Sequence, residues 1–317
     1  METHISWLLI TEWHVFKMKK PVKFSFLDFS TPALREHYCR RELELNRRIP
    51  TGGMYMAVVE IQRIGEELFI GDEDGDVVDF AVMMKRQDTS LQMHRLLEQG
   101  RVDAAPVKAI ACKIAAFHHA AKLIKTPFDA KVFEETFDDL ISVREFVIGH
   151  LDHWAYEVID SSVRISDRFV EDHKAQFQER VDRRLVRDVH GDLHSGNIFL
   201  YEDPVIFDCI EFNDAFRQID LLNEIGFFLM DLDAWDQEEL GEVFLGTYLE
   251  AFPEVMSTPF DRQLLTYYKL YRANVRAKVM ALNATQHEGE KQQKELVKEA
   301  EVYLHLMERY LKDLETG

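Results

Sequence analysis

The sequence contains few cysteines, and none of them is placed for a disulfide framework or a zinc site. Its 317 residues include three cysteines, Cys39, Cys112 and Cys209, with no CxxC pair. This pattern favours a reducing compartment, and we expect a cytoplasmic protein. An apolar run of membrane-spanning length is also missing, and residues 1–10 lack the basic segment and cleavage site of a signal peptide. We therefore expect no membrane partner.

Positive charge is scarce as well. Lysine and arginine total 38 against 57 aspartates and glutamates, which gives a formal net charge of −19. A general nucleic-acid binder is more often basic, because it gains its affinity by neutralising phosphates. The balance predicts no nucleic-acid partner. It suits a cationic small substrate, although an acidic surface is more often explained by solubility.

The phosphate-binding motif GxxxxGK[ST] is absent, which excludes a P-loop nucleotide site in this chain. Hydrophobic residues make up 46% of the sequence and are spread over its whole length. That composition predicts an ordered globular protein with one large domain or two lobes.

The first part of the chain is typical of strands arranged around one helix. Thr31 and Pro32 suit the cap and first turn of a helix that we expect to end near Arg48. Alternating β-branched and aromatic residues predict strands on both sides of it. These strand segments are 5–18, 55–64, 67–70 and 77–84, and a polar turn is expected at 71–76.

After about residue 85 the pattern becomes mostly helical. Helices are predicted at 91–100, 106–122, most of 133–159, 167–187 and nearly everything from 216, with two short apolar runs at 197–200 and 204–207. The last helix, 291–314, is expected to pack through Leu296, Val302, Leu306 and Tyr310. The fold class is therefore α+β, with a small antiparallel β lobe at residues 1–88 and a large helical lobe at 89–317.

One polar constellation carries the chemistry. Residues 190–197 read HGDLHSGN, and residues 205–208 read VIFD. Phosphoryl transfer needs a carboxylate for the acceptor hydroxyl, together with an amide and a second carboxylate for Mg²⁺. Asp192, Asn197 and Asp208 supply this set. The alternative interpretation is a buried polar turn, in which His and Asp pair and Asn caps.

These segments resemble the catalytic and metal loops of the aminoglycoside phosphotransferase/choline kinase superfamily, distant relatives of protein kinases. The chain is most similar to a bacterial aminoglycoside phosphotransferase-like family whose members often carry a following P-loop domain, which is absent here. The match includes ETHISW at 2–7, VFKMKKPV at 15–22, FLDFST at 26–31, YCRRELELNRR at 38–48, AAFHHAA at 115–121, VHGDLHSGNIFL at 189–200, IFDCIEFNDAFRQIDLLNEI at 206–225 and YRANVRAKV at 271–279. The block at 189–225 is specific, and the other segments occur in the right order.

The resemblance implies a two-lobed protein-kinase-like fold and a role for each loop residue. Asp192 matches the catalytic aspartate, and His190 would brace its loop by hydrogen bonding. Asn197 and Asp208 match the magnesium ligands. Cys209 follows Asp208 where protein kinases have Phe-Gly. That difference, and the short distance to Asp220, speak against a protein kinase and favour small-molecule acceptors.

Two further carboxylates near these loops have alternative interpretations. Asp220 resembles a residue that supports the catalytic loop from the following helix, but it can equally be a charge at a helix N-terminus. Glu211 is a candidate for contact with metal or substrate.

The resemblance also predicts a phosphate-binding lysine on a strand and a glutamate partner on the helix. Lys17 is the first candidate for the lysine, and Lys19, on the same strand face, is the alternative. Glu42 is favoured over Glu44 as the partner because its spacing to Ile49 matches the family better.

The nucleotide-covering part of the site is less complete in the sequence. No GxGxxG precedes Lys17, and Thr3-His4-Ile5-Ser6 occupies the matching place, where Ser6 is expected to contact phosphate. The small lobe is thus expected to lack an edge strand or to be truncated at its N-terminus. The segment containing Met83 and Lys85 is predicted to supply adenine-facing groups, although core packing explains the methionines equally well.

Arg272 and Arg276 share a helix face late in the chain, beside Tyr271 and Lys278. They are candidates for binding an anionic acceptor, and pairing with acidic residues is the favoured alternative. Taken together, the sequence predicts a phosphotransferase that moves the γ-phosphoryl group of ATP or GTP, with Mg²⁺, to a hydroxyl of a small molecule. The alternative is a nucleotide-binding pseudokinase or regulatory protein without turnover.

Overall fold

The computed structural model describes residues 2–3, 5–24, 27–71, 74–286 and 289–316. His4 and residues 72–73 of the predicted turn lie outside this part. The chain forms two compact units: residues 1–113 with 190–218, and residues 114–189 with 219–317. The bounds of these units differ from those of the predicted lobes at 1–88 and 89–317. The division into those two lobes stays a prediction.

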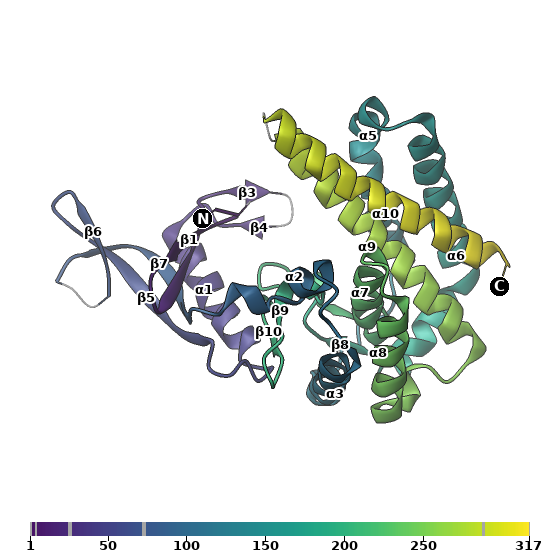
Figure 1. Ribbon diagram of the computed structural model, residues 1–317, viewed down its shortest axis with the longest axis horizontal. Coiled ribbons are helices and arrows are strands. Elements are labelled where there is room, and N and C mark those ends of the chain that lie inside the picture. The colour runs from purple at the N-terminus through teal and green to yellow at the C-terminus, as the bar shows by residue number, and fades with distance from the viewer. Residues whose placement is uncertain (1, 4, 25–26, 72–73, 287–288, 317) are drawn as a thin grey trace. The chain divides into compact units, whose positions relative to one another are not determined.

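A curled antiparallel sheet forms the beginning of the first unit (Figure 1). Its strand order is β1-β2-β7-β5-β6, so the central strand β7 is bonded on both sides. The strands are β1 (Ser6–Ile10), β2 (His14–Lys19), β5 (Tyr55–Ile64), β6 (Glu67–Ile70) and β7 (Asp76–Lys85). A small separate hairpin joins β3 (Lys23–Phe24) and β4 (Leu27–Asp28).

Helix α1 (Pro32–Asn46) packs against strands β5 and β7 of this sheet. It begins as the sequence predicts: Thr31 Oγ1 accepts the Leu34 N–H at 3.3 Å, and Pro32 occupies the first turn. Its buried residues recur at helical spacing and include both apolar and charged side chains: Arg35, Cys39, Glu42, Leu45 and Asn46. The face that packs on the sheet therefore carries Glu42 inward.

The remaining elements of the first unit are short. They are η1 (Thr89–Leu91), α2 (Met93–Glu98), η3 (Ser195–Asn197), β9 (Ile198–Phe199), β10 (Val205–Ile206), η4 (Asp214–Phe216) and the first part of α3 (Ala104–Ala120). Strands β9 and β10 form an antiparallel hairpin in which Ile206 lies opposite Ile198. Phe199 and Val205 of this hairpin join a hydrophobic cluster with Cys39 of α1 and Val82 of β7, which ties the hairpin to the sheet.

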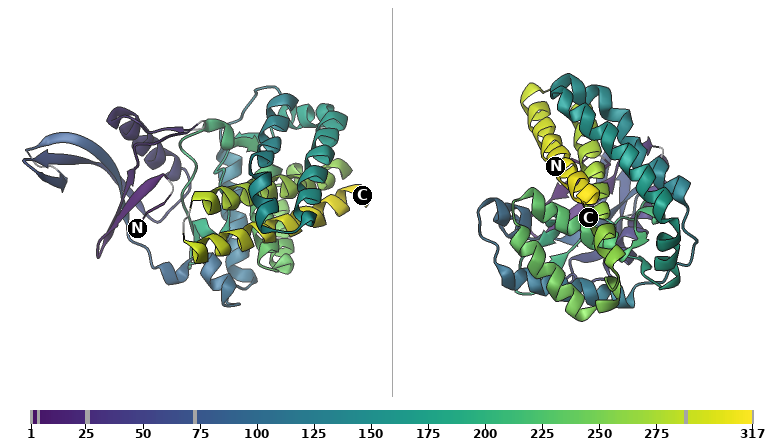
Figure 2. Two further views of the ribbon diagram at one scale, coloured as in Figure 1. Left: turned by 90° about the horizontal axis from the view of Figure 1, so that it is seen from above. Right: turned by 90° about the vertical axis from the view of Figure 1, so that its right-hand side faces the viewer.

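The second unit is mainly helical. Its helices are the end of α3, α4 (Ala130–Asp138), η2 (Asp139–Val143), α5 (Arg144–His150), α6 (His153–Asp182), α7 (Leu221–Ala234), α8 (Glu238–Ala251), η5 (Pro253–Val255), α9 (Pro259–Gln286) and α10 (Glu290–Thr316). Strand β8 (Val186–Asp188) pairs with β11 (Gln218–Asp220), whose first residue ends the first unit. Helix α10, yellow in Figure 2, lies along α9. In the part of the chain that is described, no helix combines the length and apolar character needed to cross a membrane.

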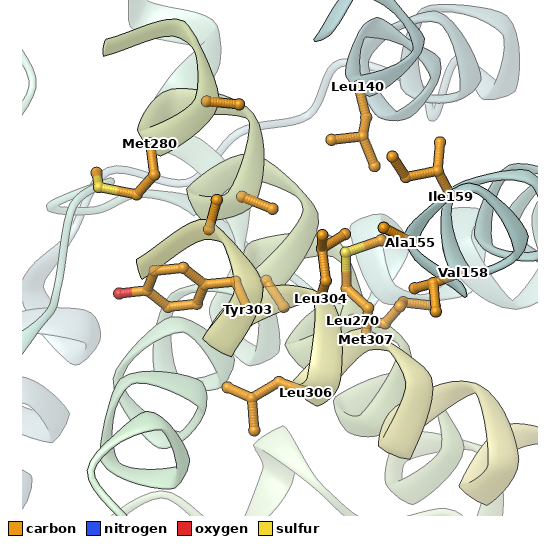
Figure 3. Close-up of a cluster of buried hydrophobic side chains, with 14 of the residues drawn as sticks. Leu140, Ala155, Val158, Ile159, Leu270, Met280, Tyr303, Leu304, Leu306 and Met307 are labelled. Atoms are coloured by element: carbon orange, nitrogen blue, oxygen red, sulfur yellow. The ribbon is translucent and has the colours of Figure 1, made fainter. Parts of the chain in front are cut away.

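The core of the second unit gathers side chains from α6, α9 and α10 (Figure 3). The last helix packs through Leu306 and Tyr310 as predicted, and Leu296 is partly buried there. The prediction for Val302 is wrong, because 42% of this residue is exposed, whereas Leu304 is fully buried. The apolar face of α10 is therefore rotated away from Val302.

Two predicted helices also differ from the structure. The helix expected at 167–187 is the second half of the longer α6, which ends at Asp182, and Val186–Asp188 is a strand. Arg184 turns the chain there with a left-handed φ of 64°, without the glycine that usually indicates such a turn. The helix expected from 216 is preceded by β11, and α7 begins only at Leu221.

Candidate active site

Lys17 lies on β2 and reaches two carboxylates of the first unit. Its Nζ is 2.9 Å from Glu42 Oε1 and 2.6 Å from Asp208 Oδ1. Burial alone would lower the pKa of Lys17, but Asp208 and Glu42 raise it well above its usual value. The lysine predicted for phosphate, its predicted helix partner and a predicted magnesium ligand thus lie together. Glu44, the alternative partner, is instead mostly exposed and pairs with Arg41.

Lys19, two residues further on the same strand face, has a different environment. Its side chain is fully buried, with Nζ 2.9 Å from Glu42 Oε2, bonded to Glu211 and 4.9 Å from the centre of the Phe29 ring. Each Glu42 oxygen therefore binds a different lysine. Burial would raise the pKa of Glu42, but Lys17 and Lys19 outweigh it and lower that pKa to about 2.

Asp208 stands two residues after the end of β10 in a left-handed backbone conformation, with φ at 65°. This conformation is uncommon for a residue with a Cβ and often marks a functional position. Two side chains that the sequence analysis did not single out hold the backbone here. The Asp208 N–H donates to Tyr55 Oη at 3.1 Å, and the Cys209 N–H donates to Asn46 Oδ1 at 3.0 Å. Asn46 could have been found as a polar residue four positions after Glu42 on the same helix face.

His190 braces the loop that contains Asp192. Its Nδ1 accepts the Asp192 N–H at 3.3 Å, and that bond assigns the ring proton to Nε2, which donates to Phe207 O at 2.9 Å. Gly191 between them has φ at 87°, and a Cβ there would lie 2.8 Å from Phe216 O. Only glycine fits that turn without displacement of the chain.

Asp192 and Asn197 are joined by their side chains. Asn197 Nδ2 donates to Asp192 Oδ2 at 2.8 Å and to Asp192 O at 3.0 Å, which orients the Asn197 side-chain oxygen away from Asp192. His194 belongs to the motif at 190–197, but no role was predicted for it. Its Nδ1 accepts the Gly196 N–H, and its Nε2 lies 3.4 Å from Asp192 Oδ2. Two neighbours therefore fix the direction of the Asp192 carboxylate.

The β9–β10 hairpin brings the two loops together. Asn197 precedes β9 and Asp208 follows β10, and the Phe207 N–H donates to Asn197 O at 3.0 Å across the hairpin. An amide oxygen and a partly exposed carboxylate thus come to the same hairpin end, and both are hard ligands of the kind that Mg²⁺ takes. Among the described residues, no group of three or more His, Cys, Asp and Glu side chains forms a metal cage. The residues fit a Mg²⁺ whose other ligands would come from a nucleotide and water.

Glu211 faces both Lys19 and a surface cavity. Burial raises its pKa above the usual value, and Lys19 opposes that effect only in part. The cavity measures about 470 Å³ and has a polar lining of side chains from α1 and from the segment after Glu211: His37, Tyr38, Arg41, Glu44, Phe212, Asn213 and Asp214.

The other predicted nucleotide contacts are placed as follows. Ser6 is fully buried, lies opposite Lys19 in the sheet, and its Oγ has no hydrogen-bond partner among the described residues. Met83 is half-buried in the central strand, between β2 and β5. The Lys85 side chain is exposed, and its N–H already donates to Met54 O at 2.8 Å. This N–H is therefore not free for adenine.

Three predicted residues belong to the second unit and have partners there. Asp220 caps α7 by accepting the Leu222 N–H at 2.7 Å, and it pairs with the buried Arg180. Arg272 donates to Asn223 Oδ1 and lies over the ring of Phe227. Arg276 donates to Tyr303 Oη at 3.3 Å. These described partners account for the three side chains within the second unit.

Comparisons of the sequence with known proteins give relatives but no family name. No family model matches the chain. Uncharacterized proteins of Mycobacterium bovis and Mycobacterium tuberculosis are 28% identical to it over 298 residues. The match covers 91% of this chain and 56% of each relative. The chain therefore spans about half the length of the curated relatives it matches.

Solved structures give the fold. The chain is similar to a choline kinase from Cryptosporidium parvum, with a TM-score of 0.59 and 11% identity over 100% of this chain and 88% of that one. Matches with a TM-score of 0.46 include the amicoumacin kinase hAmiN, covering 96% and 89% of the two chains, and a Plasmodium vivax ethanolamine kinase, covering 93% and 75%. The choline kinase match assigns this chain a kinase-like α+β fold, with a small curled antiparallel sheet and a large helical region.

Proposed function

We propose that this protein is a phosphotransferase that moves the γ-phosphoryl group of ATP or GTP to a hydroxyl group of a small molecule. The observation that carries the proposal is the contact of Lys17 with both Glu42 and Asp208. A phosphate-binding lysine held by a helix glutamate, beside a metal-binding aspartate, is the arrangement that kinases need. The kinase-like fold supports the same proposal.

Each side chain then has a role in the reaction. Lys17 binds phosphate oxygens and Glu42 orients it. Asp192 accepts the proton of the acceptor hydroxyl, in a direction fixed by Asn197 and His194. Asn197 and Asp208 would hold Mg²⁺, which neutralises charge on the phosphates when it is bound.

The Lys17–Asp208 contact must change when nucleotide and Mg²⁺ bind. Lys17 would leave Asp208 and bind phosphate, and Asp208 would leave Lys17 and bind Mg²⁺. Each new partner carries a higher charge than the one it replaces. Ser6 Oγ has no hydrogen-bond partner among the described residues and lies on the face of the sheet that carries Lys17 and Lys19, so we propose it as a further donor for phosphate. Backbone and hydroxyl groups near Ser6 would thus take the place of a glycine-rich loop.

The same contacts also motivate the second candidate, a nucleotide-binding protein without turnover. Lys17 is occupied by two carboxylates, and the sequence has no GxGxxG motif before it. In either case the proposed partners are a nucleotide and a small molecule, in a reducing cytoplasm that suits the three free cysteines. The cavity beside Glu211 is one candidate place for the small molecule.

Asp192→Asn and Asp208→Asn test the proposal in one assay. In an acceptor screen that follows nucleotide consumption, Asp192→Asn should lower kcat by about 10²–10⁴-fold, because it removes the proton acceptor. It should retain the rise in Tm caused by nucleotide with Mg²⁺. Asp208→Asn should lose the Mg²⁺-dependent part of that rise. Asparagine is chosen because it tolerates the left-handed backbone at this position.

The outcomes separate the two candidates. Wild-type turnover that disappears in Asp192→Asn supports the phosphotransferase. Mg²⁺-dependent binding without transfer to any acceptor supports the second candidate. Full turnover by Asp192→Asn contradicts its catalytic role, and absence of any nucleotide effect on Tm contradicts both candidates.

A further inference from the structure

The paired lysines of β2 have unequal surroundings, although both bind Glu42. Lys17 retains 13% exposure of its side chain, and its second partner, Asp208, is 39% exposed. Lys19 has no exposure, and its second partner, Glu211, retains 4%. An ion pair in contact with solvent can exchange partners at low cost. Separation of a buried pair leaves an uncompensated charge in the interior, which is strongly destabilising.

The proposed reaction requires only one of these pairs to open. Nucleotide with Mg²⁺ must separate Lys17 from Asp208, whereas nothing in the reaction needs the Lys19 pairs to change. Glu42 keeps one oxygen on Lys19 throughout that exchange. Helix α1 carries Glu42, so the same bond fixes the helix relative to the sheet.

We propose that Lys19, held by Glu211, is a positioning residue that fixes Glu42 and helix α1 in the paired position before nucleotide binds, which leaves Lys17 free to exchange Asp208 for phosphate. This inference rests on the proposed function for its catalytic meaning. The hold that Lys19 has on Glu42 is the bond between their side chains. It does not require nucleotide, so its effect on α1 can be measured in the nucleotide-free protein.

Cys39 reports the position of α1. It is fully buried on the same helix face, three residues before Glu42, and burial raises its pKa to about 12. Lys19 opposes that rise, so loss of Lys19 would by itself make the thiol less reactive. If Cys39 is alkylated faster after loss of Lys19, the cause is therefore exposure of the Cys39 side chain to solvent and not a lower thiol pKa. Peptide mapping by mass spectrometry separates Cys39 from the exposed Cys112.

The experiment compares four variants of the full chain without nucleotide. Lys19→Met should speed Cys39 alkylation at least tenfold, and Lys17→Met should leave it within twofold of wild type. Lys113→Met is the matched control: its side chain is 11% exposed and binds Asp203, Pro204 O and Pro50 O in the same unit, none of which belongs to α1. It should also leave Cys39 protected.

The double variant Lys19→Met with Glu211→Gln separates positioning from charge balance. Neutralising Glu211 removes the buried charge that Lys19→Met leaves unpaired, so the free energy of unfolding in urea should recover. Cys39 should still react at least tenfold faster than in wild type, and the KM for nucleotide should rise about fivefold or more. If the double variant regains both stability and Cys39 protection, Lys19 only balances charge and the inference is overturned.

Cys39 protection that is lost equally in Lys17→Met and Lys19→Met also overturns the inference, because the two lysines would then be equivalent. A wild-type protein that binds no nucleotide overturns the proposed function instead. In that case Lys19-dependent protection of Cys39 still supports the hold on Glu42.

Discussion

At the scale of single residues, the site depends on side chains that take no part in chemistry. Asn46 shows this best. It donates to Glu42 O and accepts the Cys209 N–H, so one amide links the helix that carries the glutamate to the segment that carries Asp208. Asn46 is nearly fully buried, which makes a missing partner costly.

We expect Asn46→Leu to lower the free energy of unfolding by about 1–3 kcal/mol, because it leaves the Cys209 N–H buried without an acceptor. Urea denaturation measures the loss. Glu44→Gln, an exposed change on the same helix, serves as the control and should stay within about 0.5 kcal/mol of wild type. Equal stabilities for the two variants would show that the Asn46 bond contributes nothing.

The sequence singled out the candidate site residues but not the side chains that support them. Asp192, Asn197 and Asp208 stand out because phosphoryl transfer, the proposed reaction, restricts the chemistry and spacing of its residues. Lys17 and Glu42 could be selected over their neighbours only by family spacing. Tyr55 could not be selected, because its partner is a backbone group more than 150 residues away along the chain. Asn46 has an equally distant partner, and only its place on the helix face of Glu42 could have indicated it.

At the scale of elements, prediction succeeded where the cause is local. The Thr31-Pro32 start of α1 and the alternating strands β5 and β7 follow from capping and from two-residue periodicity. Strand β8 was missed because its three residues are extended only through pairing with β11, about thirty residues later. Val302 was assigned to the wrong face of α10, because a long charged helix permits more than one apolar stripe.

The two faces of α10 give a direct prediction. Leu304→Ala should lower the free energy of unfolding by about 2–5 kcal/mol, because it leaves a cavity among the helices of the second unit (Figure 3). Val302→Ala, two residues away on the exposed side, is the matched control and should change it by at most about 0.5 kcal/mol. Thermal or urea unfolding compares them, and a larger loss for Val302→Ala would refute the assigned face.

At the scale of the whole molecule, one buried histidine makes stability depend on pH. His118 is fully buried, with Nδ1 2.8 Å from Tyr248 Oη and Nε2 3.9 Å from Glu224 Oε1. Burial lowers the pKa of His118 below its usual 6.5, and Glu224 opposes this only in part. The folded protein therefore prefers the neutral ring.

The sign of the pH effect follows from that preference. Above the unfolded-state pKa of 6.5 the ring is neutral in both states, and its contribution to stability is fully present. As the pH falls below 6.5 and through the lower folded-state pKa, the unfolded chain binds the proton first and the contribution is lost. We expect the stability advantage of wild type over His118→Asn to shrink over this window in urea titrations. Parallel pH curves for the two proteins would exclude this linkage.

The left-handed backbone of Asp208 has a consequence for how this sequence can vary. Glycine would adopt that φ with less strain than any residue with a Cβ, by about 1–2 kcal/mol, so folding alone would favour it. The proposed function, in contrast, needs a carboxylate there, which pairs with Lys17 and would bind Mg²⁺. Selection for stability and selection for the proposed reaction thus favour different residues at this position. A relative that no longer carries out the reaction could gain stability by replacing Asp208 with glycine, so a glycine at this position would indicate that the function has been lost.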